Sequence, residues 1–227
     1  PSSPQSLGYI SGTSNHILEN LDILNNTLAV ATHEDGVLLY DISNPSSPEL
    51  INTIQADNAW TVYLDNHYIY IGDESNLSIC NYNNNYCEWS LELPNSIKDI
   101  KGDSDYLFVA LGTDGVMHLG KRNGFPPEIY DIYNTSALAN RLDIILTFED
   151  EAGSAVAVSD WDDVEILQIK LEDNTLEKVG YKNTTRRTMA IATKVNERYI
   201  YSAEWATVQI FEFGEVEDAD IDLSTYE

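Results

Sequence analysis

The chain has 227 residues, and its 38 acidic and 12 basic residues give a formal net charge of −26 at pH 7. A charge of this size and sign repels phosphate backbones and anionic lipid headgroups, so we expect no nucleic-acid partner and no direct insertion into a membrane. No apolar run is long enough for a transmembrane helix, and the length is compatible with one large all-β domain. A second interpretation of the charge is a surface that is simply well solvated.

A pattern of two short strands recurs five times along the chain. Each copy has an apolar strand, a turn that contains acidic residues or glycine, and a second strand, which is typical of a β-hairpin. The copies span residues 26–42, 67–82, 105–120, 154–169 and 198–213. A repeat of roughly 40 to 50 residues is typical of the blades of a β-propeller.

One more short strand is expected ahead of each copy, and another after each of the first four. The following strands are expected at residues 49–54, 88–93, 128–132 and 176–181. After Phe213 the chain is too acidic to form an equivalent strand for the fifth copy. The turn Pro-Ser-Ser-Pro precedes the strand at residues 49–54 and also opens the chain at residues 1–4, so we expect residues 6–10 to supply the missing strand.

The pattern therefore predicts an all-β fold, namely a five-bladed β-propeller formed by residues 1–214 and closed by its N-terminal strand. Each predicted blade has apolar residues on both faces, and a closed ring gives every blade the two neighbours that can bury them. Residues 215–227 are expected to form an acidic tail or a linker to a following domain. A sandwich of two sheets is the alternative fold, but it does not explain the fivefold repeat.

The two cysteines, Cys80 and Cys87, flank a polar turn that is rich in asparagine. Because this turn lies between two short apolar segments, the cysteines are expected across a hairpin and within disulfide distance. A disulfide would imply an oxidising compartment. Two buried free thiols are the alternative, and the spacing fits no zinc motif.

The segment GVLLYDISNPSSPELINTI, residues 36–54, resembles the LVIVD repeat of bacterial and archaeal surface-associated β-propellers. The similarity is partial at residues 1–10, and at residues 120–129 only a Pro-Glu-Ile ending remains. The resemblance implies a β-propeller that is extracellular or displayed at the cell surface, and the family offers no catalytic residues to transfer. Residues 219–227, ADIDLSTYE, resemble the opening strand of the Hydin-like β-sandwich modules that often follow in extracellular bacterial proteins. We therefore expect a monomeric domain of a larger multidomain protein.

In a β-propeller, the turns between the second and third strands of the blades gather on one face. Here these turns and one connection between blades carry carboxylates, a histidine and three tryptophans. The candidate ligand-binding residues are Trp60, His33, Glu34, Asp73, Glu74, Asp114, Asp160, Trp161, Asp162, Glu204 and Trp205. Exposed aromatic rings beside carboxylates suit stacking against a carbohydrate or contact with a basic protein. Alternatively, each tryptophan covers the edge of a neighbouring blade and the carboxylates are only solvated.

The innermost strands suggest a second site, on the axis of the predicted propeller. Asn20, Asp99 and Asp143 fall at roughly equivalent positions in three blades. Their side-chain oxygens are the ligands that Ca²⁺ prefers, so Ca²⁺ is the one cofactor that the sequence suggests. A polar channel filled with water is the alternative.

The sequence contains no motif that is typical of an enzyme. It has no nucleophile elbow, no pair of histidines at metal-binding spacing and no phosphate-binding glycine loop. We therefore expect a non-catalytic extracellular interaction module that binds a protein or a glycan through its acidic, tryptophan-bearing face. A calcium-dependent hydrolase or lyase, with its metal in the axial channel, is the alternative.

Overall fold

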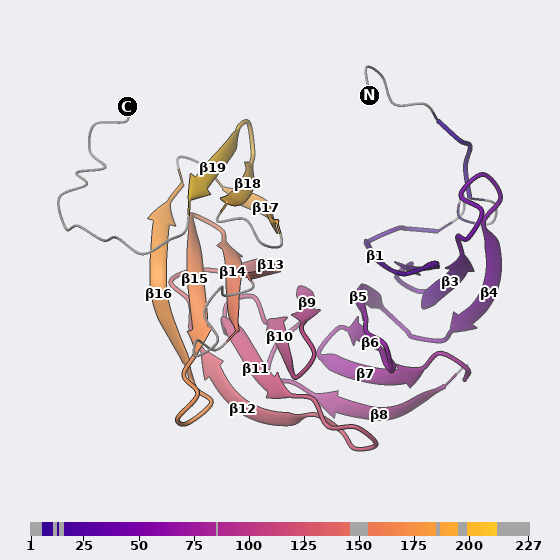
Figure 1. Cartoon of the computed structure of the whole chain (residues 1–227), viewed down its shortest axis with the longest axis horizontal. Coiled ribbons are helices and arrows are strands. Elements are labelled where there is room, and N and C mark those ends of the chain that lie inside the picture. Colours follow the sequence, from indigo (N-terminus) through magenta and orange to yellow (C-terminus); the bar gives the residue numbers. More distant parts are fainter. Residues whose placement is uncertain are drawn as a thin grey trace.

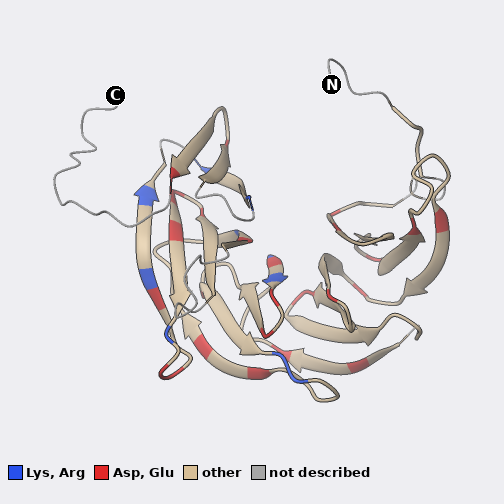
Figure 2. Cartoon of the chain, in the orientation of Figure 1, with Lys and Arg blue, Asp and Glu red and all other residues tan. Residues whose placement is uncertain are grey.

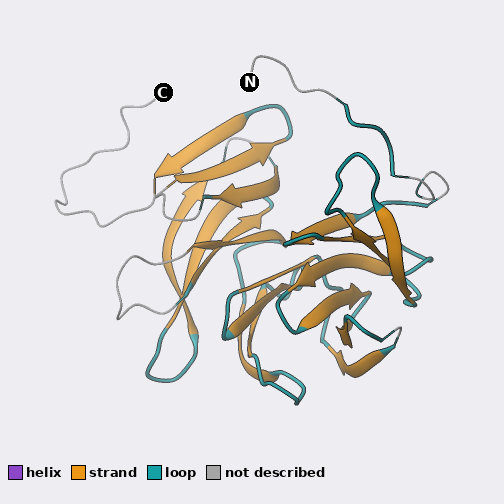
Figure 3. Ribbon diagram, turned by 45° about the vertical axis from the view of Figure 1, so that its right-hand side comes forward, coloured by secondary structure: helices purple, strands orange, loops and turns teal. Residues whose placement is uncertain are grey.

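The computed structural model describes residues 6–10, 13, 16–84, 86–145, 154–184, 187–194 and 199–212. Over these residues the fold is all-β, as predicted: nineteen strands form five antiparallel sheets, and no helix is present (Figure 3). A helix long and apolar enough to cross a membrane is absent from this described part of the chain.

Each sheet is formed by strands that are consecutive in the chain (Figure 1). Sheet 1 contains β1 (Asn20–Leu24), β2 (Thr27–Ala31), β3 (Val37–Asp41) and β4 (Glu49–Ile54). Sheet 2 contains β5 (Ala59–Leu64), β6 (Tyr68–Asp73), β7 (Asn76–Asn81) and β8 (Cys87–Glu92). Sheet 3 contains β9 (Asp99–Gly102), β10 (Tyr106–Ala110), β11 (Val116–Gly120) and β12 (Glu128–Tyr133). Sheet 4 contains β13 (Ala139–Ile145), β14 (Ala155–Asp160), β15 (Asp163–Ile169) and β16 (Leu176–Asn183). Sheet 5 contains β17 (Thr188–Thr193), β18 (Tyr199–Glu204) and β19 (Val208–Glu212).

Short turns join the second and third strands of each sheet, and two of these turns require glycine. Gly36, between β2 and β3, has a φ of 78°, and a Cβ atom there would lie 2.2 Å from the backbone oxygen of Ile54. Gly115, between β10 and β11, has a φ of 80°, and a Cβ atom there would lie 2.1 Å from the backbone oxygen of Tyr133. Both turns therefore need a residue that tolerates a left-handed conformation and has no side chain.

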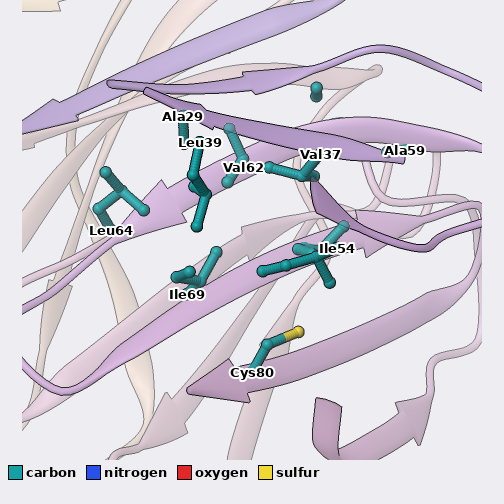
Figure 4. Packing of buried hydrophobic residues seen from close by; sticks show 11 residues of the cluster. Ala29, Val37, Leu39, Ile54, Ala59, Val62, Leu64, Ile69 and Cys80 are labelled. Carbon is teal, nitrogen blue, oxygen red and sulfur yellow. The ribbon is translucent and has the colours of Figure 1, made fainter. Parts of the chain in front are cut away.

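The hydrophobic core is divided among the seams between neighbouring sheets. Successive side chains of a strand point to opposite faces, so each sheet of apolar residues has two faces to bury. Figure 4 shows the seam between sheets 1 and 2, where Val37, Leu39 and Ile54 meet Val62 and Ile69. Similar clusters fill the seams between sheets 2 and 3, sheets 3 and 4, and sheets 4 and 5. The interior sheets are thus buried between two neighbours.

The two cysteines form a disulfide between strands β7 and β8. Cys80 and Cys87 are partners in the antiparallel pairing of these strands, and their Cα atoms lie 3.8 Å apart. The sulfur of Cys80 also belongs to the core between sheets 1 and 2 (Figure 4). The predicted disulfide is therefore present, and it ties together the two outer strands of sheet 2.

The N-terminal segment does not complete sheet 5 in the structure. Residues 6–10 form no strand, and Leu7 and Tyr9 are 62% and 98% exposed. Ile10 packs instead against an apolar cluster on the free face of sheet 1, which contains Leu28 and Tyr40. Sheets 1 and 5 lie at the two ends of an open arc (Figure 1). The predicted closure of the ring is therefore not confirmed, because Ile10 packs against sheet 1 and residues 6–10 form no strand beside β19. The predicted acidic tail, residues 215–227, lies outside the described residues.

Candidate functional site

The turns between the second and third strands of the sheets meet the segments that open the next sheet. Backbone hydrogen bonds join a turn of one sheet to the first residues of the neighbouring inner strand. The residues joined in this way are His33 with Ala59, Gly112 with Ala139, and Trp161 with Thr188. Because every such junction lies at the same end of its sheet, the turns share one face of the molecule, which we call the turn face.

Two tryptophans flank one connection on the turn face. Trp161, in the turn between β14 and β15, has a φ of 58°, and its backbone oxygen accepts a hydrogen bond from the backbone N–H of Thr188 at 2.7 Å. Trp205, in the turn between β18 and β19, donates its own backbone N–H to the oxygen of Arg187 at 3.0 Å. The guanidinium of Arg187 lies 4.6 Å from the ring centroid of Trp161, within the range of a cation–π contact. Trp205 is 69% exposed. We call Trp161 and Trp205 the tryptophan pair.

Exposed carboxylates accompany these rings on the turn face. Glu34, Glu74 and Asp162 are exposed at the tips of three turns. Asp73 is half-buried, and its two side-chain oxygens accept hydrogen bonds from the backbone N–H groups of residues 57 and 58. Asp73 therefore holds a connection in place, while the three exposed carboxylates remain accessible to a partner.

The third tryptophan of the predicted site, Trp60, has a different environment. Its side chain is half-buried, with the Nζ of Lys98 5.5 Å from the ring centroid and the ring of His33 at 6.4 Å. His33 belongs to sheet 1, Trp60 to sheet 2, and Lys98 precedes sheet 3. Trp60 therefore covers the ends of two seams, as in the alternative interpretation of these tryptophans.

Two of the carboxylates that were expected on the turn face are buried. Asp160 has no exposed surface and accepts hydrogen bonds from Thr135, Ser136 and the backbone N–H of Ala137. Glu204 is 7% exposed. A macromolecular ligand on the surface does not reach either group. Asp114, the remaining predicted residue, is half-buried.

The residues that were expected on the axis link the inner strands to one another. The Nδ2 of Asn20 donates to the Oγ1 of Thr61 at 3.0 Å, and Thr61 donates to the Oδ1 of Asp99 at 3.3 Å. The other oxygen of Asp99 accepts the backbone N–H of Leu142 at 2.9 Å. These bonds run in sequence from sheet 1 to sheet 4.

Asp143 continues the same chain of hydrogen bonds rather than joining Asn20 and Asp99. Its Oδ2 accepts the backbone N–H of Thr193 at 2.5 Å and the hydroxyl of Thr193 at 3.0 Å. This interaction links sheet 4 to sheet 5. Asp143 does not line the cavity that Asn20 and Asp99 share.

That cavity has a volume of about 220 Å³ and lies between the inner strands. Asp99 lines it together with the basic residues Lys101 and Arg141. Figure 2 shows the acidic and basic positions side by side on β9, near the centre of the arc. Burial raises the pKa of Asp99, while Lys101, the N–H of Leu142 and Arg141 act in the opposite direction. Glu19 also lines the cavity, so two cationic side chains balance its two carboxylates, and no excess negative charge remains to attract a further cation.

The structure adds two residues that were not among the expected ones, Asp163 and Glu165. Both are buried in β15, close to Asp160. A signal was visible in the sequence, since two acidic residues alternate with apolar ones within a predicted strand. The sequence did not show that these side chains point toward a neighbouring sheet.

Comparison with known proteins yields structural likeness only. No protein-family model matches the chain, and no curated protein matches its sequence. The β-propeller domain of Cps50 (Swd1) from Myceliophteria thermophila is similar, with 11% identity, a TM-score of 0.71, and coverage of 88% of this chain and 71% of that one. A protein from Lactobacillus plantarum is similar with 14% identity, a TM-score of 0.75, and coverage of 90% and 69%. The computationally designed Ika8 protein is similar with 8% identity, a TM-score of 0.66, and coverage of 86% and 58%. The chain thus spans between 58% and 71% of the length of these proteins. Likeness at this level of identity shows the fold alone, and the fold is that of a β-propeller.

Proposed function

We propose that this chain is a non-catalytic interaction module that binds a protein or a glycan through the turn face. The observation that carries the proposal is the tryptophan pair. The two rings flank residues 187 and 188, Trp205 is largely exposed, and Arg187 lies against the ring of Trp161. Aromatic rings with a polar edge are enriched where proteins bind partners, because one end contacts apolar surface while the other stays hydrated.

The charges around the tryptophan pair suit a ligand with many hydrogen-bond donors. Exposed carboxylates such as Asp162 accept hydrogen bonds from hydroxyl or amino groups, and an aromatic ring stacks against the apolar face of a sugar. A basic segment of a protein would satisfy the same groups. The strongly acidic composition of the whole chain, with a formal charge of −26, also favours a neutral or basic partner.

An extracellular location fits two features of the chain. The disulfide between Cys80 and Cys87 is stable in an oxidising environment. Residues 36–54 resemble the LVIVD repeat of surface-associated propellers. Together these features support a module displayed outside the cell, and we propose that it is a monomeric domain of a larger protein.

We further propose that the ring of five blades closes, with residues 6–10 as the outermost strand of sheet 5. Two apolar surfaces at the ends of the arc support this. On sheet 5, Val208 and Ile210 are 68% and 62% exposed, and on sheet 1, Leu21 and Ile23 are 58% and 54% exposed. Burial of these side chains against each other would remove a large apolar area from water.

The experiment that tests the binding proposal uses oligosaccharide and basic-peptide microarrays. We expect the wild-type chain to be retained on one of them, and the double variant Trp161→Ala with Trp205→Ala to lose retention at least about tenfold, which corresponds to roughly 1.4 kcal/mol. The melting temperature should change little, because Trp205 is 69% exposed and Trp161 belongs to none of the core clusters of the described residues.

A matched control is Phe125→Ala. Phe125 is 59% exposed, lies 5.4 Å from the guanidinium of Arg122 and follows β11 at the opposite end of its sheet. We expect this variant to keep full retention. Absence of wild-type retention on both arrays, or equal loss in the control variant, would overturn the assignment of the turn face.

A further inference from the structure

Three acidic side chains are buried together in sheet 4, at the end of the seam that faces sheet 3. Asp160 ends β14, Asp163 begins β15, and the two residues are partners in the antiparallel register. Glu165 is two positions further along β15, so it projects from the same face as Asp163. One oxygen from each carboxylate can be chosen such that all three lie within 4.8 Å of one another. We call Asp160, Asp163 and Glu165 the buried triad.

The buried triad is almost completely removed from solvent. Asp160 and Glu165 have no exposed surface, and Asp163 is 5% exposed. Within the described part of the chain, the one cation in ion-pair contact with the triad is Lys178, whose Nζ lies 3.0 Å from the Oε1 of Glu165. Three ionised carboxylates would therefore share one positive charge in a region of low dielectric constant, where repulsion between like charges is strong.

The segment that connects sheets 3 and 4 donates hydrogen bonds to only some of the carboxylate oxygens of the buried triad. Thr135 and Ser136 donate their hydroxyls to the two oxygens of Asp160 at 2.8 and 2.9 Å, and Ser136 also lies 3.2 Å from the Oδ2 of Asp163. The Oδ1 of Asp163 and the Oε2 of Glu165 are buried and have no hydrogen-bond partner. A buried carboxylate oxygen without a partner is unfavourable, and two of them in one cluster indicate that a positively charged group belongs there.

The ionisation of the cluster agrees with this geometry. Burial, followed by the charges of Glu165 and Asp160, raises the pKa of Asp163 to about 6. The hydroxyl of Ser136 lowers this pKa but does not outweigh the other effects.

We propose that the buried triad binds one divalent cation of the hard, oxygen-preferring class, with Ca²⁺ as the expected ion. Calcium binds oxygens at about 2.3–2.6 Å, so oxygens that lie within 4.8 Å of one another are able to share a single ion. The hydroxyl of Ser136 and water molecules complete a coordination sphere of six or more oxygens. The triad offers neither sulfur nor nitrogen, and this composition favours Ca²⁺ over Zn²⁺ or Cu²⁺.

The ion would join two segments that are distant in sequence. Residues 161 and 162 form the turn between Asp160 and Asp163, and residues 134–138 connect β12 to β13. A cation on the triad fixes both segments at once, because Asp160 already holds the connection through Thr135 and Ser136. The turn that carries Trp161 is thereby made rigid by an ion on its buried side. This metal site lies in a seam between sheets, away from the axial residues Asn20 and Asp99.

The test is calcium binding to the full chain after dialysis against a chelator, measured by isothermal titration calorimetry in 0.15 M NaCl. We expect one Ca²⁺ per chain. At a calcium concentration of roughly 100 times the dissociation constant, the melting temperature should rise by about 5–10 °C. The variant Asp163→Asn with Glu165→Gln should lose this binding and this rise, because the side-chain shapes remain while two negative charges are removed.

The matched control is Asp99→Asn, which neutralises a buried carboxylate of the axial cavity. We expect the control to bind Ca²⁺ as the wild type does. Should the double variant fail to fold, Glu165→Gln alone is examined by terbium luminescence excited through tryptophan, where we expect at least a tenfold weaker signal than in the wild type. Absence of calcium binding to the wild type would overturn the proposal, and so would an equal thermal response in the folded triad variants. Loss of binding in Asp99→Asn alone would move the site to the axis.

Discussion

Lys121 forms a largely buried ion pair across the seam between sheets 2 and 3. Its Nζ lies 2.9 Å from the Oδ2 of Asp65, and the two side chains are 9% and 15% exposed. The ammonium also donates to the backbone oxygen of Asp103 and lies 5.0 Å and 5.4 Å from the ring centroids of Tyr63 and Tyr70. Burial acts to raise the pKa of Asp65, but hydrogen bonds from Lys121 and from the backbone outweigh it, so the pKa is lowered. This carboxylate therefore stabilises the folded chain in its ionised form.

We expect Asp65→Asn to lower the free energy of unfolding by about 3 kcal/mol at pH 7, because Lys121 would stay buried without its counter-ion. The pKa of Asp65 is lower in the folded chain than the ordinary value of 3.8, so its contribution is present above pH 3.8 and is lost as the pH falls through the folded value. Chemical unfolding of both proteins over a range of pH measures the difference. The exposed pair of Arg122 and Glu128, at 3.8 Å, provides the control, and Glu128→Gln should leave stability unchanged. A difference that persists undiminished far below pH 3.8 would contradict this prediction.

Most individual strands could be located from the sequence, because the alternation of apolar residues is a local property. The repeat at residues 67–82 contains β6 and β7, and the strand expected at residues 49–54 is β4. The strand expected at residues 128–132 lies within β12. Outer strands were recognisable because they follow their hairpins after a short turn. The disulfide was predictable for the same reason, since both cysteines belong to one hairpin.

The environment of the candidate site residues depended on segments far away in the chain. Asp160 was expected on the surface, but residues 135–137 cover it and donate to it. Asp143 was expected to face the axis freely, but Thr193, fifty positions later, binds its carboxylate. Local periodicity gives the face of a strand but not which segment covers that face. For this reason the buried triad was not recognised, while the exposure of Trp205 agrees with the expectation for a turn.

The disulfide constrains one pair of elements, strands β7 and β8. Its cysteines are separated by 7 positions. The disulfide lowers the conformational entropy of the unfolded chain, and for so short a loop this adds about 2–3 kcal/mol to the free energy of unfolding. We expect Cys80→Ser with Cys87→Ser to lose that amount of unfolding free energy in urea. Wild type in reductant should match the variant, and reduction should raise the mass of the chain by two hydrogen atoms, one on each sulfur. Free thiols in the non-reduced wild type would contradict the assignment.

At the scale of the whole molecule, mutation distinguishes a closed ring of sheets from an open arc. We expect Leu7→Asp to lower the free energy of unfolding by about 1–3 kcal/mol if residues 6–10 pack on sheet 5, because an apolar side chain would lose its burial. Leu50→Asp is the matched control, since Leu50 is 54% exposed on the outermost strand β4 and should tolerate the change. Equal stability of wild type and both variants would show that the arc stays open in solution.

The hydrogen bonds between inner strands differ from one seam to the next. Between sheets 1 and 2 a side-chain amide donates to a hydroxyl, and between sheets 2 and 3 a hydroxyl donates to a carboxylate. Between sheets 3 and 4, and between sheets 4 and 5, a carboxylate accepts a backbone N–H group. The apolar surfaces of the repeats resemble one another closely enough that several incorrect neighbours could pack together. Distinct donors and acceptors make the repeats non-interchangeable, since a repeat in the wrong place would leave a buried polar group unmatched. The different pairing of donor and acceptor at each seam therefore favours one neighbour for each sheet over the others.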